Sequence, residues 1–171
     1  VNSGASATVN GVTVSNIVNT NGTITANIVA DCSATTATFT LTVTDAGGLS
    51  TNASLTVTVN ANTPPVLTYN NPAAVVTGQN GINISPATGP SDNGSVTSVQ
   101  LQSAGTFTGN VSVNPNGTIA ISNAGPAGTH TIQIRATDNC GAQTTASFQI
   151  TVNPASTATN VQTVINAPNY G

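Results

Sequence analysis

One hairpin-like stretch occurs twice in this chain, and it limits the possible folds more than any other feature. Residues 43–60 read VTDAGGLSTNASLTVTVN and residues 136–153 read ATDNCGAQTTASFQITVN, and the two align without a gap at a spacing of 93 residues. In each copy a strand with alternating apolar residues leads into a short turn, and a second alternating strand returns. The turns open at Asp45 and Asp138. Two hairpins of one design predict two β-domains of the same fold.

The apolar residues on both sides of each turn recur at every second position. They are Phe39, Leu41 and Val43, then Leu55, Val57 and Val59 in the first copy, and Ile132, Ile134 and Ala136, then Phe148, Ile150 and Val152 in the second. A period of two is typical of half-buried strands. No helical period and no apolar run of about 18 residues occurs, so we expect an all-β protein without a membrane helix.

Shorter repeats support the same division. The Asn-Gly turn in NTNGTI at 19–24 is answered by NPNGTI at 114–119. Val9, Val12 and Val14 share their spacing with Val96, Val99 and Leu101, which predicts one strand in each domain. Further strands are expected around 66–69, 75–76 and 82–84, between turn residues.

The proline-containing segment ANTPP after Asn60 predicts a linker. We therefore predict a first domain over 1–61, a second over 62–153 and a C-terminal tail over 154–171. Nothing before Val9 corresponds to the block 61–95 that opens the second domain. The first domain is thus expected to lack its opening strands, while the tail reads like the opening of a third domain.

The T-D-x-x-G hairpin and the closing V-T-V-N before a proline-rich join resemble bacterial immunoglobulin-like and cadherin-like tandem repeats of surface proteins. The resemblance covers residues 9–153. It implies seven-stranded sandwiches in which the repeated hairpin supplies the last two strands, and it implies no catalytic residues. Some relatives bind calcium at junctions, for which Asp45 and Asp138 are the candidates here. Because the four Asp are isolated and no Glu is present, we favour a turn-forming role and expect no metal.

The chain has one cysteine per predicted domain. In tandem sandwiches of the implied kind, the loop that carries Cys32 and the turn that carries Cys140 face each other across the junction. We predict a Cys32–Cys140 disulfide that fixes the interdomain angle, which implies an oxidising compartment. The alternative is two buried free thiols.

An incomplete sandwich exposes strand edges and apolar side chains, and so favours a strand from elsewhere. We predict that residues 160–166 are that strand, with Val161, Val164 and Ile165 as anchors, and that they insert into the first domain of the next copy. Residues 1–8 or a neighbouring chain would fill the remainder. The alternative is a fragment of a longer repeat protein with ragged ends. The start at Val1, without an initiator Met, fits either a removed signal peptide or a fragment.

Charged residues make up only 3% of the chain, with a net charge of −3. Arg135 is the only basic side chain besides His130, so nucleic acid and anionic lipid are not expected partners. Such a surface favours association unless sugar separates the molecules. With one His, no Glu, no Lys and no G-x-S-x-G motif, we expect no enzyme and no cofactor. His130 is interpreted as a strand residue.

Six Asn-x-Ser/Thr sequons are candidates for glycosylation. They are Asn21, Asn52, Asn83, Asn93, Asn110 and Asn116. Together these features predict a secreted or cell-surface structural subunit that polymerises head to tail into a pilus-like filament by strand donation. The alternative is a pair of non-catalytic adhesin repeats, acting as a stalk or a glycan-binding module of a larger surface protein.

Overall fold

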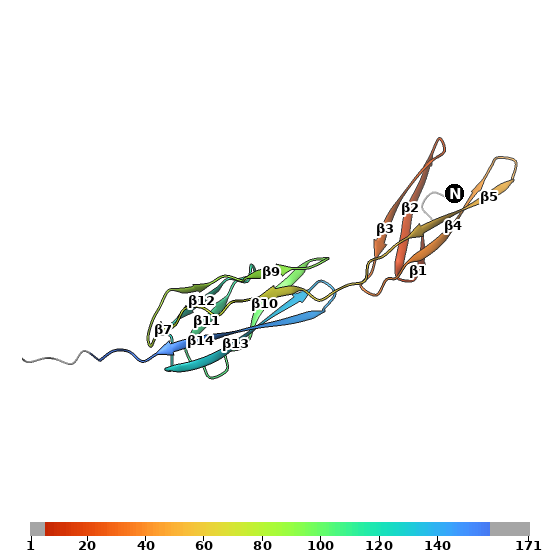
Figure 1. Cartoon of the computed structure of the whole chain (residues 1–171). Coiled ribbons are helices and arrows are strands. Elements are labelled where there is room, and N and C mark those ends of the chain that lie inside the picture. Colours follow the sequence, from red (N-terminus) through yellow and green to blue (C-terminus); the bar gives the residue numbers. More distant parts are fainter. Residues whose placement is uncertain (1–5, 158–171) are drawn as a thin grey trace, which may run out of the picture. The chain divides into compact units, whose positions relative to one another are not determined.

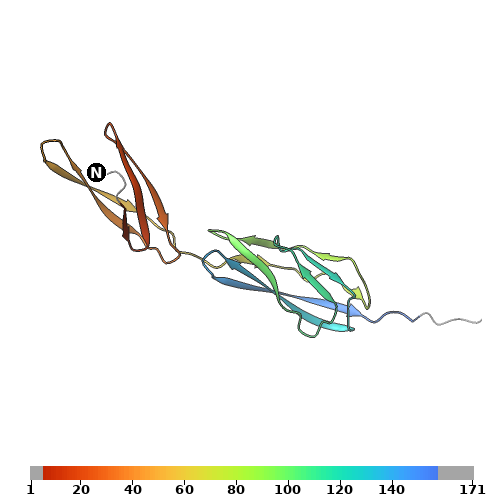
Figure 2. The ribbon, with the colours of Figure 1, turned by 180° about the vertical axis from the view of Figure 1, so that it is seen from behind.

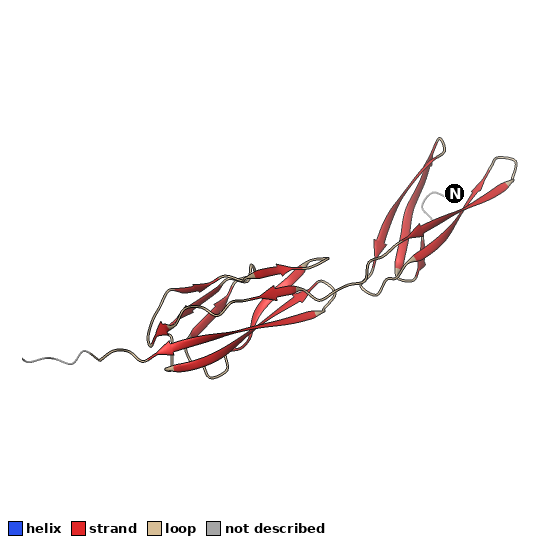
Figure 3. Ribbon diagram, viewed as in Figure 1, coloured by secondary structure: helices blue, strands red, loops and turns tan. Residues whose placement is uncertain are grey.

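The computed structural model of the chain describes residues 6–157. All fourteen regular elements in that range are β-strands, as Figure 3 shows. The described residues form two compact units. Unit 1 contains residues 6–65 with Ser91–Thr97 and Thr137–Gln143, and unit 2 contains Val66–Pro90, Ser98–Ala136 and residues 144–157. The predicted all-β class is confirmed.

Unit 1 consists of five strands in two sheets. One sheet has the order β1–β2–β3, and the other is the β4–β5 hairpin. Their bounds are β1 Ala7–Val9, β2 Val12–Thr20, β3 Thr23–Ala30, β4 Ala37–Thr44 and β5 Ser50–Val57. The β2–β3 and β4–β5 hairpins lie close together at the end that carries the β3–β4 loop and diverge toward their turns (Figure 1 and Figure 2).

The alternating pattern of β4 and β5 forms the predicted hairpin. Phe39 pairs with Leu55 and Leu41 with Ala53 across the two strands. Phe39 is buried against Val12 and Val14 of β2, whereas Leu55, Val57 and Val59 are only partly buried at the border of this cluster. The predicted inward face of the hairpin is therefore confirmed, but Leu55, Val57 and Val59 on it remain partly accessible to solvent.

The strand predicted from Val9, Val12 and Val14 is wrong. Asn10 and Gly11 both have positive φ, 48° and 76°, and form a two-residue turn between β1 and β2. Asn-Gly is the preferred pair for such a turn because its backbone requires the left-handed region twice. Val9 therefore pairs back onto Val12 instead of continuing the strand.

The Asn21–Gly22 turn predicted between the next two strands is confirmed, with φ of 51° and 88°. A register shift between Ser15 and Val18, with positive φ at Asn16, marks a bulge in β2. Because a bulge adds one residue to the strand, Val14 and Ile17 are both buried although three positions separate them.

Unit 2 is built from the remaining nine strands, except that end residues of β9, β10, β13 and β14 belong to unit 1. The bounds are β6 Val66–Thr68, β7 Val75–Val76, β8 Ile82–Ile84, β9 Thr88–Ser91, β10 Val96–Ser103, β11 Asn110–Val113, β12 Ile119–Ser122, β13 Gly128–Asp138 and β14 Gln143–Asn153. The sheets have the orders β10–β13–β14–β7, β11–β12–β8 and β6–β9. The predicted opening strands near 66–69, 75–76 and 82–84 are confirmed.

Two of these opening strands cover the core of unit 2. β7 pairs in parallel with the end of β14, where Val75 faces Val152, and β8 pairs antiparallel with β12. On β14, Phe148, Ile150 and Val152 are buried. Within residues 6–157 of the chain, the corresponding edges of β5 and β3 in unit 1 pair with no further strand. The two units therefore differ in whether these two places are filled.

Candidate functional site

The turns that close the two repeated hairpins are nearly identical. The nitrogen of each turn-opening aspartate donates to a carbonyl four residues on, at 2.9 Å for Asp45 and 3.0 Å for Asp138. One carboxylate oxygen of each accepts from two backbone N–H groups. These belong to Gly47 and Leu49 for Asp45, at 2.9 Å each, and to Cys140 and Ala142 for Asp138, at 2.8 Å each. Both aspartates thus form turns, as predicted.

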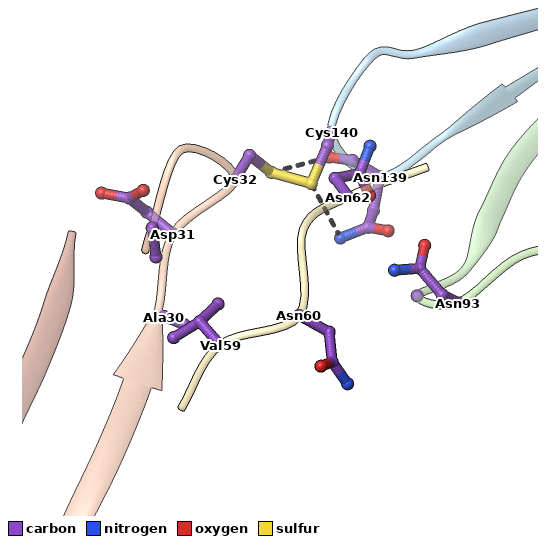
Figure 4. Close-up of a pocket in the computed structure, with 11 residues that line it drawn as sticks. Ala30, Asp31, Cys32, Val59, Asn60, Asn62, Asn93, Asn139 and Cys140 are labelled. Atoms are coloured by element: carbon purple, nitrogen blue, oxygen red, sulfur yellow. Dashed lines mark hydrogen bonds between the residues drawn. A yellow bond between two sulfur atoms is a disulfide. The ribbon is translucent and has the colours of Figure 1, made fainter. Parts of the chain in front are cut away.

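Cys32 and Cys140 form a disulfide with a Cα–Cα distance of 5.4 Å (Figure 4). The predicted pairing is confirmed, and the alternative of two free thiols is wrong. Both residues belong to unit 1, since the Asp138 turn is part of it. The bond ties the β3–β4 loop to the turn of the second hairpin.

Side-chain amides surround this disulfide within unit 1. Asn62 donates to the second carboxylate oxygen of Asp138 at 2.7 Å. Asn93 donates to the Ala61 carbonyl at 3.0 Å and accepts from the backbone and hydroxyl of Thr63. A cavity of about 130 Å³ lies among these groups (Figure 4). The sequence interpretation missed this network, because Asn62, Asn93 and the Asp138 turn lie far apart in the sequence.

Hydrogen bonds stabilise the charged carboxylates of Asp138 and Asp31 in this part of unit 1. The Asn62 amide, followed by backbone N–H groups of the turn, lowers the pKa of Asp138, while desolvation opposes the shift. The hydroxyl and backbone N–H of Ser33 lower the pKa of Asp31. Residues 6–157 contain no group of three or more His, Cys, Asp or Glu arranged to hold a metal ion.

Replacing Asp138 with alanine should reduce the acid sensitivity of folding. Because the folded-state pKa of Asp138 is lowered, its contribution is present above the ordinary value of 3.8 and is lost as the pH falls through the folded value. The wild-type melting temperature should therefore drop between about pH 5 and pH 2 more steeply than that of D138A. Asp45→Ala is the matched control, because it removes the same turn bonds without the Asn62 contact. Equal pH profiles for wild type and D138A would contradict the assignment.

An apolar groove of about 220 Å³ lies between the two sheets of unit 1. Its lining residues come from β2, β3, β4 and β5 and are Val14, Ile17, Ile24, Ala26, Ile28, Leu41 and Leu55. Ile24 is 36% exposed, whereas Ile119, which follows the matching Asn-Gly turn, is fully buried. The groove is therefore the place where the core of unit 1 remains open. Most of its lining was not predicted, although Ile24, Ala26 and Ile28 alternate in the sequence.

The predicted donor anchors Val161, Val164 and Ile165 lie outside the described residues. Ala7 and Thr8, proposed with residues 1–6 to fill the remainder, pair instead with β2 on its side away from β3. They do not cover the groove.

The His130 side chain is held by contacts with neighbouring residues of unit 2. Its Nε2 lies 2.8 Å from the Pro126 carbonyl oxygen, which can only accept, so Nε2 carries a proton and donates. In the neutral ring Nδ1 then accepts from the Thr106 hydroxyl at 2.7 Å. The ring is buried and meets Phe107 edge-on. These contacts agree with its interpretation as a strand residue.

All six sequon asparagines are exposed. Asn21 occupies a turn with positive φ. The amide of Asn93 already donates to Ala61, and the amide of Asn110 donates to Ser122 at 3.3 Å. Of the six, Asn93 and Asn110 are thus less suited to carry a sugar than the others.

Comparison with known proteins found fold similarities only. No family model and no curated protein matches the chain. Among solved structures, it is similar to a protocadherin gammaB7 EC3–6 structure, with 19% identity, coverage of 87% of this chain and 41% of the other chain, and a TM-score of 0.43. It is similar to the protocadherin gammaB4 extracellular domain with 17% identity, coverage of 86% of this chain and 26% of the other chain, and a TM-score of 0.39. It is also similar to fibronectin(III)-like modules of Clostridium thermocellum CbhA, with 15% identity, coverage of 84% of this chain and 85% of the other chain, and a TM-score of 0.37.

The chain spans less than half the length of the protocadherin structures that it matches. No helix within residues 6–157 is long and apolar enough to cross a membrane.

Proposed function

We propose that this chain is a structural subunit of an extracellular fibre, in which a strand from one copy completes unit 1 of the next. The observation that carries the proposal is the apolar groove of unit 1, bordered by the edges of β3 and β5, which pair with no other strand among the described residues. Exposed strand edges beside apolar side chains favour pairing with another chain.

The second hairpin of the same chain indicates what fills such a groove. In unit 2 the equivalent places hold β7 and β8, which belong to the segment that follows the first hairpin. The segment that follows the second hairpin is the tail, residues 154–171, with Val161, Val164 and Ile165 in its middle. The tail of a neighbouring copy is therefore our proposed occupant.

The pairing of β7 also predicts the direction in which the donated strand runs. Because Val75 and Val76 of β7 pair in parallel with Val152 and Asn153, a donated strand that takes the place of β7 would run parallel to the chain that continues β5, beside Val59 and Asn60. One strand fills one of the two open places, and the edge of β3 remains for a second segment. Since the donor tail and the acceptor groove are different surfaces, the contact is heterologous and propagates as a fibre unless it closes into a ring.

The donor strand needs support from other contacts. Burying three branched aliphatic side chains contributes about 1.5–3 kcal/mol each, whereas association costs an estimated 4–15 kcal/mol. Hydrogen bonds along β5 and a further contact between copies would supply the difference.

One observation supports an extracellular place for the fibre, and glycosylation would agree with it. The Cys32–Cys140 disulfide is typical of oxidising compartments. Glycans on exposed asparagines such as Asn21 and Asn116 would separate surfaces that carry almost no charge.

The test is the size of the full chain beside a chain that ends at Asn153. We expect the full chain to elute in the void volume and to show fibres by electron microscopy, and the shortened chain to elute as a monomer. A pair of adhesin repeats would be monomeric in both forms, which would overturn the proposal.

A further inference from the structure

We infer that the Asp45 turn of unit 1 is a second contact surface between copies, and that it binds the β12–β13 loop, residues 123–127, of the copy that donates its tail. The inference rests on the proposed function and identifies the further contact that the donor strand requires. It is argued from the partners of the equivalent Asp138 turn.

The Asp138 turn is held on its outer side by three kinds of contact. Cys140 is bonded to Cys32 in the loop that precedes the first hairpin. Asp138 accepts from Asn62 in the segment that follows the first hairpin. Asn139 accepts from the Ser95 nitrogen at 3.0 Å. This turn therefore binds the loop before, and the segment after, the hairpin that precedes it in the chain.

The Asp45 turn has the same backbone but no such partners among residues 6–157. Leu49, at the position of Ala142, is 77% exposed. A hollow of about 290 Å³ lies beside it, lined by Val43, Asp45, Leu49, Ser50 and Thr51. In the described part of the chain, hydrogen bonds reach only one of the two carboxylate oxygens of Asp45. Leu49 and the hollow beside it, together with a carboxylate oxygen that no described residue binds, therefore offer a surface that a partner carrying an apolar group and a hydrogen-bond donor can cover.

The occupant follows from the order of the elements. For the Asp45 turn, the preceding hairpin in a head-to-tail fibre is β13–β14 of the neighbouring copy. The loop before that hairpin is residues 123–127, in which Ala127 is exposed, and the segment after it begins at Pro154. Ser156 and Thr157 supply hydroxyl donors for Asp45 close to the place that Asn62 takes for Asp138. Donor strand and turn contact would thus involve the same pair of copies.

A cysteine pair tests the contact. Gly47 occupies the position of Cys140, its φ lies outside the left-handed region, and an added Cβ would lie 3.3 Å from Asp45 Oδ1, so a cysteine there requires that carboxylate to shift by only a few tenths of an ångström. In the double variant Gly47→Cys with Ala127→Cys, assembled chains should form covalent ladders on non-reducing gels, either directly or with a short bis-maleimide linker. Each single variant is the control and should give dimers at most. A double variant without ladders under both conditions, in material that still forms fibres, overturns the inference.

A second measurement is independent of cysteine geometry. Leu49→Asp should raise the concentration needed for assembly about tenfold or more, because it removes a leucine from a buried contact. Leu101→Asp, at a partly exposed leucine of β10 in unit 2, is the matched control and should assemble normally. If L49D assembles like the wild type, the turn contact is wrong while strand donation stands. If the wild-type chain is monomeric, both proposals fail.

Discussion

The Ile28→Asp chain is expected to remain monomeric at concentrations where the wild type forms fibres. Ile28 lines the groove of unit 1 and is 49% exposed, so the isolated unit should tolerate a carboxylate there. A donated strand would have to bury that charge without a partner, at a cost of several kcal/mol. A penalty of this size corresponds to a weakening of about 1000-fold.

The neighbouring residue provides the control for this substitution. Val29 lies on the opposite face of β3, is 63% exposed and does not line the groove. Val29→Asp adds the same charge to the same strand and should leave assembly unchanged. Sedimentation velocity over a range of concentrations measures both variants. Fibres from I28D, or loss of fibres in V29D as well, would show that the groove is not the acceptor.

The second large effect is expected at Ile119. This side chain is fully buried on β12, where Ile119 pairs with Ile84 of β8, so Ile119→Ala should lower the free energy of unfolding of unit 2 by about 2–5 kcal/mol. Ile24→Ala, at the equivalent place in unit 1, should cost clearly less in the chain that ends at Asn153, because Ile24 is already partly exposed. In assembled full-length chains the cost at Ile24 should rise toward that at Ile119.

Urea denaturation can measure separately the loss of stability that each of these two substitutions causes. A chain that ends at Asn153 retains Tyr69 as its only tyrosine and has no Trp. Tyr69 is buried in unit 2 and lies 5.4 Å from Phe148 between ring centroids, so its fluorescence reports that unit. Hydrogen exchange of β2 and β3 amides reports unit 1. An equal loss of stability for I24A and I119A in the shortened chain would mean that the groove is closed in the monomer.

Several features could be predicted from local sequence because local chemistry determines them. The alternation in 39–43 and 55–59 requires a two-residue period, and Asp45 and Asp138 carry the short carboxylate that binds the N–H groups of a tight turn. The Cys32–Cys140 pairing came from the order of loops that the resemblance implied. The split of β1 from β2 was missed although Asn10-Gly11 is a strong turn signal, because the valine spacing was matched to a different strand.

The rest depends on contacts between residues far apart in the chain. The burial of Ile119 depends on whether β8 pairs with β12, and the sequence around Ile119 resembles that around Ile24. The lowered pKa of Asp138 depends on Asn62, which lies 76 residues away in the sequence.

By itself the sequence determined the strands, most of the turns and the existence of two related halves, since these follow from residue periodicity and backbone preferences over a few positions. The tertiary structure decided which strand edges stay unpaired and which apolar side chains form the groove of unit 1. The physical reason is that burial and edge pairing depend on what packs against a residue, and Ile24 and Ile119 are buried to different extents although their local sequences are similar.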